Sequence, residues 1–453
     1  MIDVPGMIPT LSAWLPRQRW YHGQTEPASL TIVDQEIRGD RFPVLIRLLV
    51  DADGSVYQVL VGLRGRDTYP EFLRGNDQAV IAEVGTHQGD ALAYDAVFDA
   101  ELALVILDAV APHEKAERAR LMAAEQSNSS LVYDERIILK LFRRIRPGRN
   151  PDVEITEALA AEGFSQVAEP LATLRVGDYD LAILQPFLAG AVEGWALALT
   201  SLRDLFGMHD TASIPIITAD APPPRPDPGQ AGGDFSGEAA RLGAVTGDMH
   251  VALGDAFGRH HADAKAWAGS ISEQVDALRP GDLDPAGAHA IVDRLVELDP
   301  GYAIRVHGDY HLGQVLRTDA GWYVLDFEGE PARSLEERRR HSSPLKDVAG
   351  MLRSFHYASA VACHERDEYA LADLAAAWEN RNRQAFLRGY LRAAGPSGIL
   401  PPDPECFDVV LAAFELEKAV YELGYERAYR PDWEHIPLAA LRRITEAALT
   451  GEP

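Results

Sequence analysis

Three polar side chains in the last third of the chain have the types and spacing that phosphoryl transfer requires. Asp309 lies in a loop that is entered through Gly308, and the amide Gln314 comes five residues later. A second acid, Asp326, ends the apolar run Trp322–Leu325. Phosphoryl transfer needs an acid that takes a hydroxyl proton, and oxygen ligands that hold Mg²⁺ on nucleotide phosphates. The pattern therefore predicts Asp309 as the base and Gln314 and Asp326 as metal ligands.

Two neighbours of these acids are further candidates. Glu328 follows Asp326 by two residues and either contributes to Mg²⁺ binding or pairs with an arginine as an ordinary loop carboxylate. His307 and His311 flank Asp309 two residues to either side, and neither is interpreted as a metal ligand. We expect His307 to stabilise the loop by donating a hydrogen bond, and we count it among the residues at the substrate.

A lysine on an apolar strand is the candidate phosphate contact. Lys140 lies within the apolar run Ile137–Phe142, where an ammonium group is costly unless it is paired. A helix is expected to begin at Asn150–Pro151, with acids in its first turn. Glu154 in that turn is the expected partner of Lys140, because a strand lysine held by a helix glutamate positions nucleotide phosphates in kinases. The alternative is a surface lysine at a strand end.

Two further segments complete the predicted nucleotide site. The small polar residues 126–130 precede the Lys140 strand, and Ser127 and Ser129 are expected to present hydroxyl or N–H groups to phosphates there. An ordinary turn is the alternative. The strand-like run 179–187 ends at a proline and resembles a kinase hinge, so Gln185 and Phe187 are the expected nucleotide contacts.

The elements that position these residues divide into three predicted regions. Residues 1–110, the N-terminal cap, contain a predicted hairpin, two strands joined by the turn 51–54, and an expected helix at 94–107. Residues 111–190 form a small mixed lobe, and residues 191–453 are mostly helical. The proline- and glycine-rich stretch 221–233 interrupts the helical region as a surface loop. The predicted fold class is α+β.

Composition excludes several classes of function. The 453 residues carry a net charge of −26, which repels nucleic acids and anionic membranes. There is no apolar run long enough for a membrane span and no signal peptide, so we expect a cytoplasmic protein. Cys363 and Cys406 have no CxxC spacing, so neither a disulfide framework nor a zinc site is indicated. Nothing in the sequence sets the oligomeric state.

Several segments resemble one family of phosphotransferases. Leu15–Gly23, Tyr57–Gly62, Asp326–Arg333 and Ser343–Phe355 are similar to maltokinase-like proteins of the aminoglycoside-phosphotransferase and protein-kinase-like superfamily. The resemblance implies a bilobal protein-kinase-like fold, with an extra N-terminal cap and a mostly helical C-lobe. It also implies ATP- and Mg²⁺-dependent phosphorylation of a sugar hydroxyl.

The same resemblance implies that one helix forms the acceptor pocket. Lys418, Tyr421 and Tyr425 fall on one helical face. Without the family match, the segment is an ordinary amphipathic helix. The residues expected at the sugar are Glu415, Lys418, Tyr421, Glu422, Tyr425 and Trp433.

The favoured acceptor is glucosamine, phosphorylated at O6, and the runner-up is maltose, phosphorylated at its anomeric oxygen. Acids on the predicted helix favour an amino sugar, and His356 stands where maltokinases usually have aspartate. An antibiotic phosphotransferase is disfavoured because most such enzymes lack the cap. A pseudokinase is disfavoured because Lys140, Asp309 and Asp326 are all present.

Overall fold

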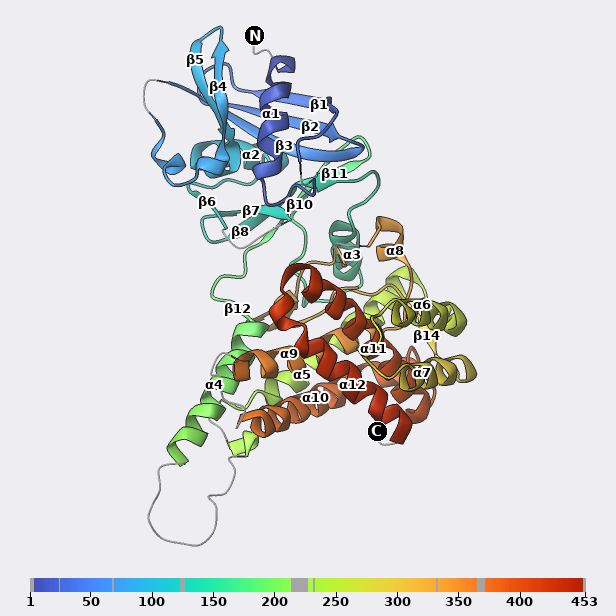
Figure 1. The fold of residues 1–453 in the computed structure, drawn as a ribbon. Coiled ribbons are helices and arrows are strands. Elements are labelled where there is room, and N and C mark those ends of the chain that lie inside the picture. Colours follow the sequence, from blue (N-terminus) through green and yellow to red (C-terminus); the bar gives the residue numbers. More distant parts are fainter. Residues whose placement is uncertain are drawn as a thin grey trace. The chain divides into compact units, whose positions relative to one another are not determined.

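The computed structural model describes two compact units. The described residues are 4–23, 25–66, 69–122, 127–212, 227–230, 233–330, 333–364 and 371–450. The first unit contains Met1–Glu157 and Ala168–Ala189, and the second contains Ala158–Val167 and Gly190–Pro453 (Figure 1). Of the expected loop 221–233, residues 221–226 and 231–232 lie outside the described residues, and Pro228–Gln230 forms a short 3-10 helix.

The first unit begins with an antiparallel sheet in the order β1-β2-β3-β5-β4. Its strands are β1 (Leu30–Arg38), β2 (Val44–Ala52), β3 (Ser55–Gly65), β4 (Val80–Thr86) and β5 (Gly89–Asp95). The predicted hairpin is confirmed, because β2 pairs with β3 and the turn residues Asp53 and Gly54 both have positive φ. Helix α1 (Ile8–Trp14) buries Leu11 and Trp14 in a core cluster shared with this sheet.

The helix expected at 94–107 begins later than predicted. Residues up to Asp95 continue strand β5, and α2 spans Ala100–Val110. The Asp99 side chain accepts hydrogen bonds from the N–H groups of Glu101 and Leu102, so it caps the helix. One face of α2 packs in a core cluster with strands of a second sheet.

The second sheet has the order β10-β11-β8-β7-β6 and carries the predicted kinase-like strands. Its strands are β6 (Ala119–Leu121), β7 (Asn128–Tyr133), β8 (Ile137–Phe142), β10 (Ala172–Val176) and β11 (Tyr179–Pro186). Helix α3 (Pro151–Ala161) follows β8, and the Asn150 side chain accepts from the Asp152 N–H at its start. The predicted start of this helix is therefore confirmed.

Arg143 joins the two sheets of the first unit. Arg143, Arg144 and Arg146 follow β8 directly, and such a basic run is usually solvated, but Arg143 is buried. Arg143 is 1% exposed and pairs with Asp95 at 2.6 Å, while its guanidinium lies 5.0 Å from the Trp20 ring. Strand β9 (Arg144–Ile145) then pairs with β3. The expected cap and small lobe thus share one compact unit.

The second unit is mainly helical (Figure 1). Its helices are α4 (Gly194–Ala212), α5 (Ser236–Phe257), α6 (Ala264–Asp276), α7 (Pro285–Glu297), α8 (Leu335–Arg339), α9 (Leu345–His364), α10 (Ala372–Ala394), α11 (Pro404–Tyr429) and α12 (His435–Thr450). Helices α5 and α10 approach closely at Gly243 and Gly389, where an added Cβ would collide with the backbone of the facing helix. Within the described residues, no helix combines the length and apolar composition needed to cross a bilayer.

Short strands complete the second unit and frame the predicted catalytic residues. They are β12 (Val192–Glu193), β13 (His260–His261), β14 (Tyr302–Ala303), β15 (Val315–Thr318) and β16 (Gly321–Val324). Strands β15 and β16 form a hairpin. Asp309 and Gln314 lie just before this hairpin, and Asp326 lies just after it. The hairpin therefore returns the chain from one predicted catalytic segment to the other.

Candidate active site

A buried carboxylate holds the loop that carries Asp309. Asp347, in the first turn of α9, accepts hydrogen bonds from the backbone N–H groups of His307 at 2.7 Å and Gly308 at 2.9 Å. Gly308 has a φ of 86°, a conformation that costs glycine little. These contacts fix the path of the chain into Asp309.

Two further helices support Asp347. His250 of α5 places its Nε2 3.1 Å from Asp347 and its Nδ1 3.0 Å from the Tyr390 hydroxyl of α10. Burial alone would raise the pKa of Asp347, but hydrogen bonds and charge from His250, with the Gly308 N–H, lower it. The loop is therefore anchored to α5, α9 and α10 through one ionised side chain.

The ring of His307 connects the Asp309 loop to the segment that carries Asp326. Its Nε2 lies 2.8 Å from the Leu325 carbonyl oxygen, and its Nδ1 lies 3.4 Å from the Asp309 N–H nitrogen. A neutral ring that donates from Nε2 and accepts at Nδ1 satisfies both contacts. His307 is only 1% exposed. The structure thus gives it the expected stabilising contacts and does not support its place among the substrate-binding residues.

The expected metal ligands lie together at the base of the β15–β16 hairpin, with Gln314 just before it and Asp326 and Glu328 just after it. Gln314 donates from Nε2 to Asp326 Oδ2 at 3.2 Å, and Asp326 has a φ of 60°. Carboxylate oxygens of Asp326 and Glu328 lie within 4.8 Å of each other. Carboxylate and amide oxygens are the hard ligands that Mg²⁺ prefers, so this set fits that ion.

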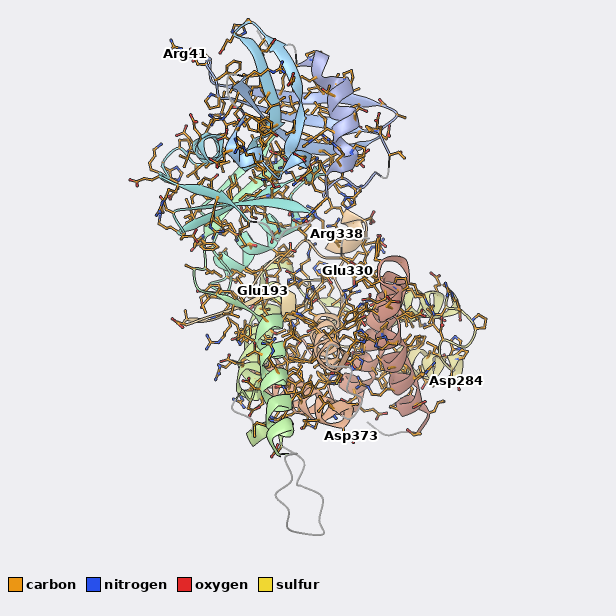
Figure 2. All side chains as sticks on the ribbon, turned by 60° about the vertical axis from the view of Figure 1, so that its left-hand side comes forward. Arg41, Glu193, Asp284, Glu330, Arg338 and Asp373 are labelled. Carbon is orange, nitrogen blue, oxygen red and sulfur yellow. The ribbon has the colours of Figure 1, made fainter. Side chains whose placement is uncertain are left out.

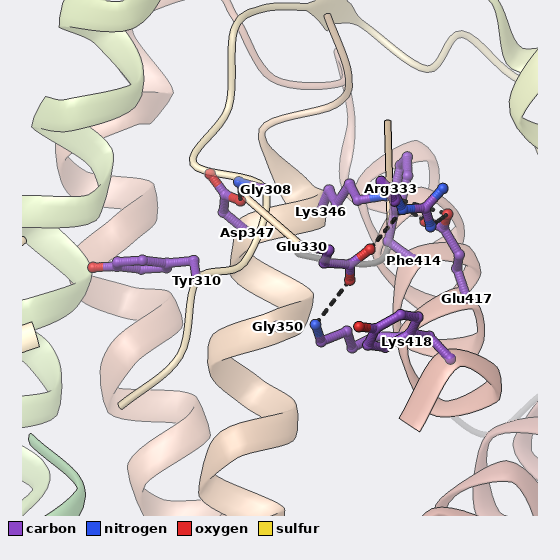
Figure 3. Close-up of a pocket in the computed structure, with 11 residues that line it drawn as sticks. Gly308, Tyr310, Glu330, Arg333, Lys346, Asp347, Gly350, Phe414, Glu417 and Lys418 are labelled. Atoms are coloured by element: carbon purple, nitrogen blue, oxygen red, sulfur yellow. Dashed lines mark hydrogen bonds and ion pairs between the residues drawn. The ribbon is translucent and has the colours of Figure 1, made fainter. Parts of the chain in front are cut away.

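A charged pocket adjoins Asp309 (Figure 3). Lys418 of α11 places its ammonium 3.0 Å from Asp309 and 2.9 Å from Glu330, and 4.9 Å from the centre of the Tyr421 ring. This acceptor pocket is lined by Gly308, Tyr310, Glu330, Arg333, Lys346, Asp347, Gly350, Phe414, Glu417, Lys418 and Tyr421. Of the six residues predicted from the family resemblance, Lys418 and Tyr421 line it.

Alternating acids and bases form the wall of this pocket. Arg333 pairs with Glu330 at 2.6 Å and with Glu417 at 3.1 Å, and Lys346 pairs with Glu417 at 3.0 Å. Burial alone would raise the pKa of Glu330, but Lys418, Lys346 and Arg333 outweigh it and hold that pKa at about 2. The pocket therefore keeps Glu330 ionised near neutral pH.

Sequence reasoning missed four of these charged residues. Glu330 follows the predicted metal acids by only a few positions, and Lys346 lies inside a segment that resembles the family. Glu417 is adjacent to the predicted Lys418. No spacing rule signals the ion pairs, because their partners lie up to 88 residues apart.

Four residues predicted at the sugar do not line the acceptor pocket. Glu415 pairs with Arg383 of α10 at 2.6 Å, and Glu422 pairs with Arg353 of α9 at 2.7 Å. Tyr425 is 44% exposed and lies against Tyr429, with ring centres 4.8 Å apart. Trp433 lies 5.2 Å from His364. Only part of the predicted helical face thus points to the pocket.

His356, which stands where maltokinases usually have aspartate, is not among the residues that line the acceptor pocket. His356 Nδ1 lies 2.9 Å from Glu379 of α10, and burial lowers the pKa of His356. Arg443 of α12 contacts the same glutamate at 3.1 Å. His356 is therefore part of a contact between helices, and it carries no argument about the acceptor.

In the first unit, Lys140 pairs with an acid of α3. Its ammonium lies 2.9 Å from Asp152, two residues before the expected partner Glu154. Both acids lie in the first turn of the helix. Asp152 is therefore an additional candidate, and the pairing of Lys140 with Glu154 stays a prediction.

The other predicted nucleotide contacts have mixed placements. Ser129 is part of strand β7, and its hydroxyl accepts from buried Arg143 at 2.8 Å, so it is not in a phosphate loop. Ser127 is exposed. Residues 123–126, which include Gln126 of the predicted polar segment, lie outside the described residues. Gln185 donates from Nε2 to the Ala168 carbonyl, and Phe187 follows β11 with its ring 5.7 Å from Arg120.

Comparison with known proteins shows what the chain resembles. Residues 14–99 match the maltokinase N-terminal cap domain. Glucosamine kinases of Mycolicibacterium smegmatis and Streptacidiphilus jiangxiensis are 27% and 28% identical to the chain, over 74% and 70% of its length. These alignments cover 81% and 71% of the two relatives. The chain is therefore similar to maltokinase-like proteins, as its sequence motifs predict.

Solved structures with the same fold also match the chain. A glucosamine kinase in complex with glucosamine, ADP and inorganic phosphate matches with a TM-score of 0.62 and 21% sequence identity. The match covers 96% of this chain and 98% of the other. A second crystal form of a glucosamine kinase matches with a TM-score of 0.64. The predicted kinase-like α+β fold with an N-terminal cap is confirmed.

Proposed function

We propose that this maltokinase-like protein is an ATP-dependent glucosamine kinase that phosphorylates O6. The observation that carries the proposal is the contact of Lys418 with both Asp309 and Glu330. Because Lys418 lines the charged pocket and contacts Asp309, the contact supports a small polar acceptor beside the expected base. The two glucosamine kinase relatives support the same acceptor.

The proposed proton acceptor is Asp309, and its contact with Lys418 supports this role. Its carboxylate accepts the proton of the sugar hydroxyl as that oxygen forms a bond to the γ-phosphorus. The bond from the γ-phosphorus to the oxygen bridging it to the β-phosphorus breaks, and ADP leaves. Lys418 orients Asp309 through their 3.0 Å ion pair.

Carboxylates and cations in the pocket wall suit an amino sugar. Glu330 and Glu417 are acceptors for the ammonium group and the hydroxyls, while Lys346 and Arg333 donate to sugar oxygens. The Tyr421 ring supplies an apolar surface for one face of the sugar. Both kinds of contact are needed to orient a small polar ring.

The phosphate donor is held by the remaining predicted residues. Asp326, Glu328 and Gln314 would hold Mg²⁺, which neutralises charge on the phosphates when bound. Lys140, supported by an acid of α3, contacts the phosphates, and Ser127, Gln185 and Phe187 are the other proposed nucleotide contacts. These roles follow from the family resemblance.

Maltose is the second candidate acceptor, since residues 14–99 match a maltokinase cap domain. A coupled ADP assay with glucosamine, N-acetylglucosamine, glucose and maltose separates the two candidates. Glucosamine should give the highest kcat/KM, and N-acetylglucosamine, which lacks the ammonium, should be much poorer. Preference for maltose would replace the proposed acceptor, and nucleotide binding without turnover on any sugar would favour a pseudokinase.

A further inference from the structure

A separate cleft opens between helices α7, α10, α11 and α12 of the second unit (Figure 1). It has a volume of about 840 Å³, within the roughly 300–1,000 Å³ typical of small-molecule sites. Asp284, which caps α7, and Asp373, in the first turn of α10, are labelled in Figure 2. We call it the four-helix cleft. The residues described at its wall and at the acceptor pocket do not overlap, so the two are distinct sites.

The four-helix cleft has an extended apolar wall. Eight of its sixteen lining residues are apolar, and they come from all four helices. Three of these are alanines, whose small side chains fill little of the space between the helices. Such a wall suits the hydrocarbon part of a ligand, which gains free energy on leaving water. The apolar residues are Ile291, Leu387, Val409, Leu411, Ala412, Ile444, Ala447 and Ala448.

The cations in the wall of this cleft are already neutralised within the protein. Each of its three arginines has a carboxylate partner on another helix. An anionic ligand would have to compete with those carboxylates, so the arginines do not favour one. The pairs are Arg383–Glu415 at 2.6 Å, Arg294–Glu405 at 2.9 Å and Arg443–Glu379 at 3.1 Å.

Asp408 of α11 is the exception among the acids of the wall. Within the part of the chain that the structure describes, it has no cationic partner, although it lines the cleft. Burial raises the pKa of the Asp408 carboxyl, and no neighbouring cation offsets this rise. With the arginines paired, Asp408 leaves one unbalanced negative charge in the cleft. Asn380 and Gln384 of α10 add exposed amide groups.

We propose that the four-helix cleft binds a small amphipathic amine, with its ammonium group on Asp408 and its apolar part between α10, α11 and α12. The charge of such a ligand complements Asp408, and its hydrocarbon complements the wall. The amides of Asn380 and Gln384 are available to polar groups of the ligand. This site goes beyond the proposed phosphoryl transfer and does not depend on it.

The first test uses three probes that share an apolar chain and differ in their head group: octylamine, octanol and octanoate. Isothermal titration of the full chain at neutral pH measures their Kd values. Octylamine should bind at least about tenfold more tightly than octanoate, because only the ammonium can pair with Asp408. Absent binding of octylamine, equal binding of all three probes, or a preference for octanoate overturns the proposal.

A matched pair of variants isolates the contribution of Asp408. Asp408→Asn should weaken octylamine binding about tenfold and leave octanol binding unchanged. Glu446→Gln, at an exposed position of α12 outside the cleft lining, should leave both unchanged. Each variant removes one negative charge from a chain of net charge −26, so nonspecific attraction of the amine changes equally in both. Equal weakening in the two variants overturns the proposal.

A third variant tests the apolar wall. Ala412 is half-buried and lies one helical turn after Asp408, so Ala412→Trp should fill the cleft and abolish binding of octylamine and octanol alike. A cooperative thermal transition monitored by circular dichroism checks that the variant is folded. Unchanged binding in the folded variant overturns the proposal. A dimer that Ala412→Trp dissociates, without amine binding to the wild type, would assign the cleft to a second copy of the chain and also overturns it.

Saturating glucosamine separates this inference from the proposed function. The Kd of octylamine should change less than about twofold, because the two sites share no lining residue among those described. Displacement of octylamine by glucosamine would place the amine in the acceptor pocket and overturn the proposal. If no sugar is phosphorylated, the proposed function fails, whereas the comparison of Asp408→Asn with Glu446→Gln still decides this inference.

Discussion

Lys418 and Asp309 form a 3.0 Å ion pair across 109 residues of sequence, with Glu330 as the second partner of the same ammonium. The contact connects the α11 wall of the acceptor pocket to the loop that carries the expected base. Burial alone would lower the pKa of Lys418, but Asp309 and Glu330 raise it well above its ordinary value. One lysine thus shapes the pocket and orients the base.

Replacing Lys418 should affect acceptor use more than nucleotide binding. Lys418→Met leaves two carboxylates without their shared cation, and kcat/KM for glucosamine should fall about 100-fold, the effect of truncating a buried charged partner. Apparent affinity for ATP should stay near wild type. Steady-state kinetics with each substrate varied in turn measures both. Equal losses for ATP and glucosamine would remove Lys418 from the acceptor site.

Glu330 should give the protein a distinctive acid sensitivity. Its pKa falls from 4.5 to about 2 on folding, so its contribution to stability is complete above pH 4.5 and is lost as pH drops toward 2. The shift corresponds to about 3 kcal/mol at neutral pH. Glu330→Gln should therefore lower the free energy of unfolding near pH 7, with a difference that shrinks below pH 4.5.

Urea unfolding of the wild type and Glu330→Gln between about pH 7 and pH 3 measures this difference. Glu336→Gln is the matched control, because its side chain is 85% exposed and should show no such dependence. A Glu330→Gln deficit that stays constant across this range would contradict the depressed pKa.

Asp347 should contribute both to the free energy of unfolding and to kcat. Asp347→Asn replaces one of the oxygens that face the N–H groups of His307 and Gly308 and the ring of His250. The free energy of unfolding should drop by roughly 3 kcal/mol, as expected for a disrupted buried charge pair. Because the Asp309 loop loses its anchor, kcat should also fall. A variant with wild-type kcat would show that the loop holds its shape without Asp347.

Tyr421 and Tyr425 form a matched pair on one helix. Tyr421 lines the acceptor pocket beneath Lys418, whereas Tyr425 is largely exposed against Tyr429. Tyr421→Ala should raise the KM for glucosamine about tenfold, and Tyr425→Ala should change it by less than about twofold. Isothermal titration with glucosamine checks the same order directly. If Tyr425→Ala raised the KM more than Tyr421→Ala, Tyr425 would belong to the acceptor site, as helical spacing predicts.

The sequence predicted the local parts of the site better than its walls. Asp309, Gln314 and Asp326 were predictable because the loop and hairpin between them are short. Residue spacing identifies which side chains share a helical face, but not which element packs against that face. Glu415 and Glu422 are therefore predicted at the sugar from spacing, although they lie elsewhere. Helix α11 is buried on several sides, so these two acids pair with arginines of α10 and α9.

Arg143 illustrates the other limit of sequence reasoning. A run of three nearby arginines is usually solvated, but this one is buried against Asp95 and Trp20. Its burial depends on strand β9 pairing with β3, a contact between segments almost 90 residues apart. The motifs of the cap are visible in the sequence. The contacts between the cap and the second sheet are visible only in the structure.

The rate of phosphoryl transfer in a single turnover of Asp309→Asn tests the central claim most directly. The account predicts a rate at least about 1,000-fold below wild type, with ATP affinity near wild type in a parallel binding titration. A near-normal single-turnover rate would show that another group accepts the sugar proton and that Asp309 is not the base.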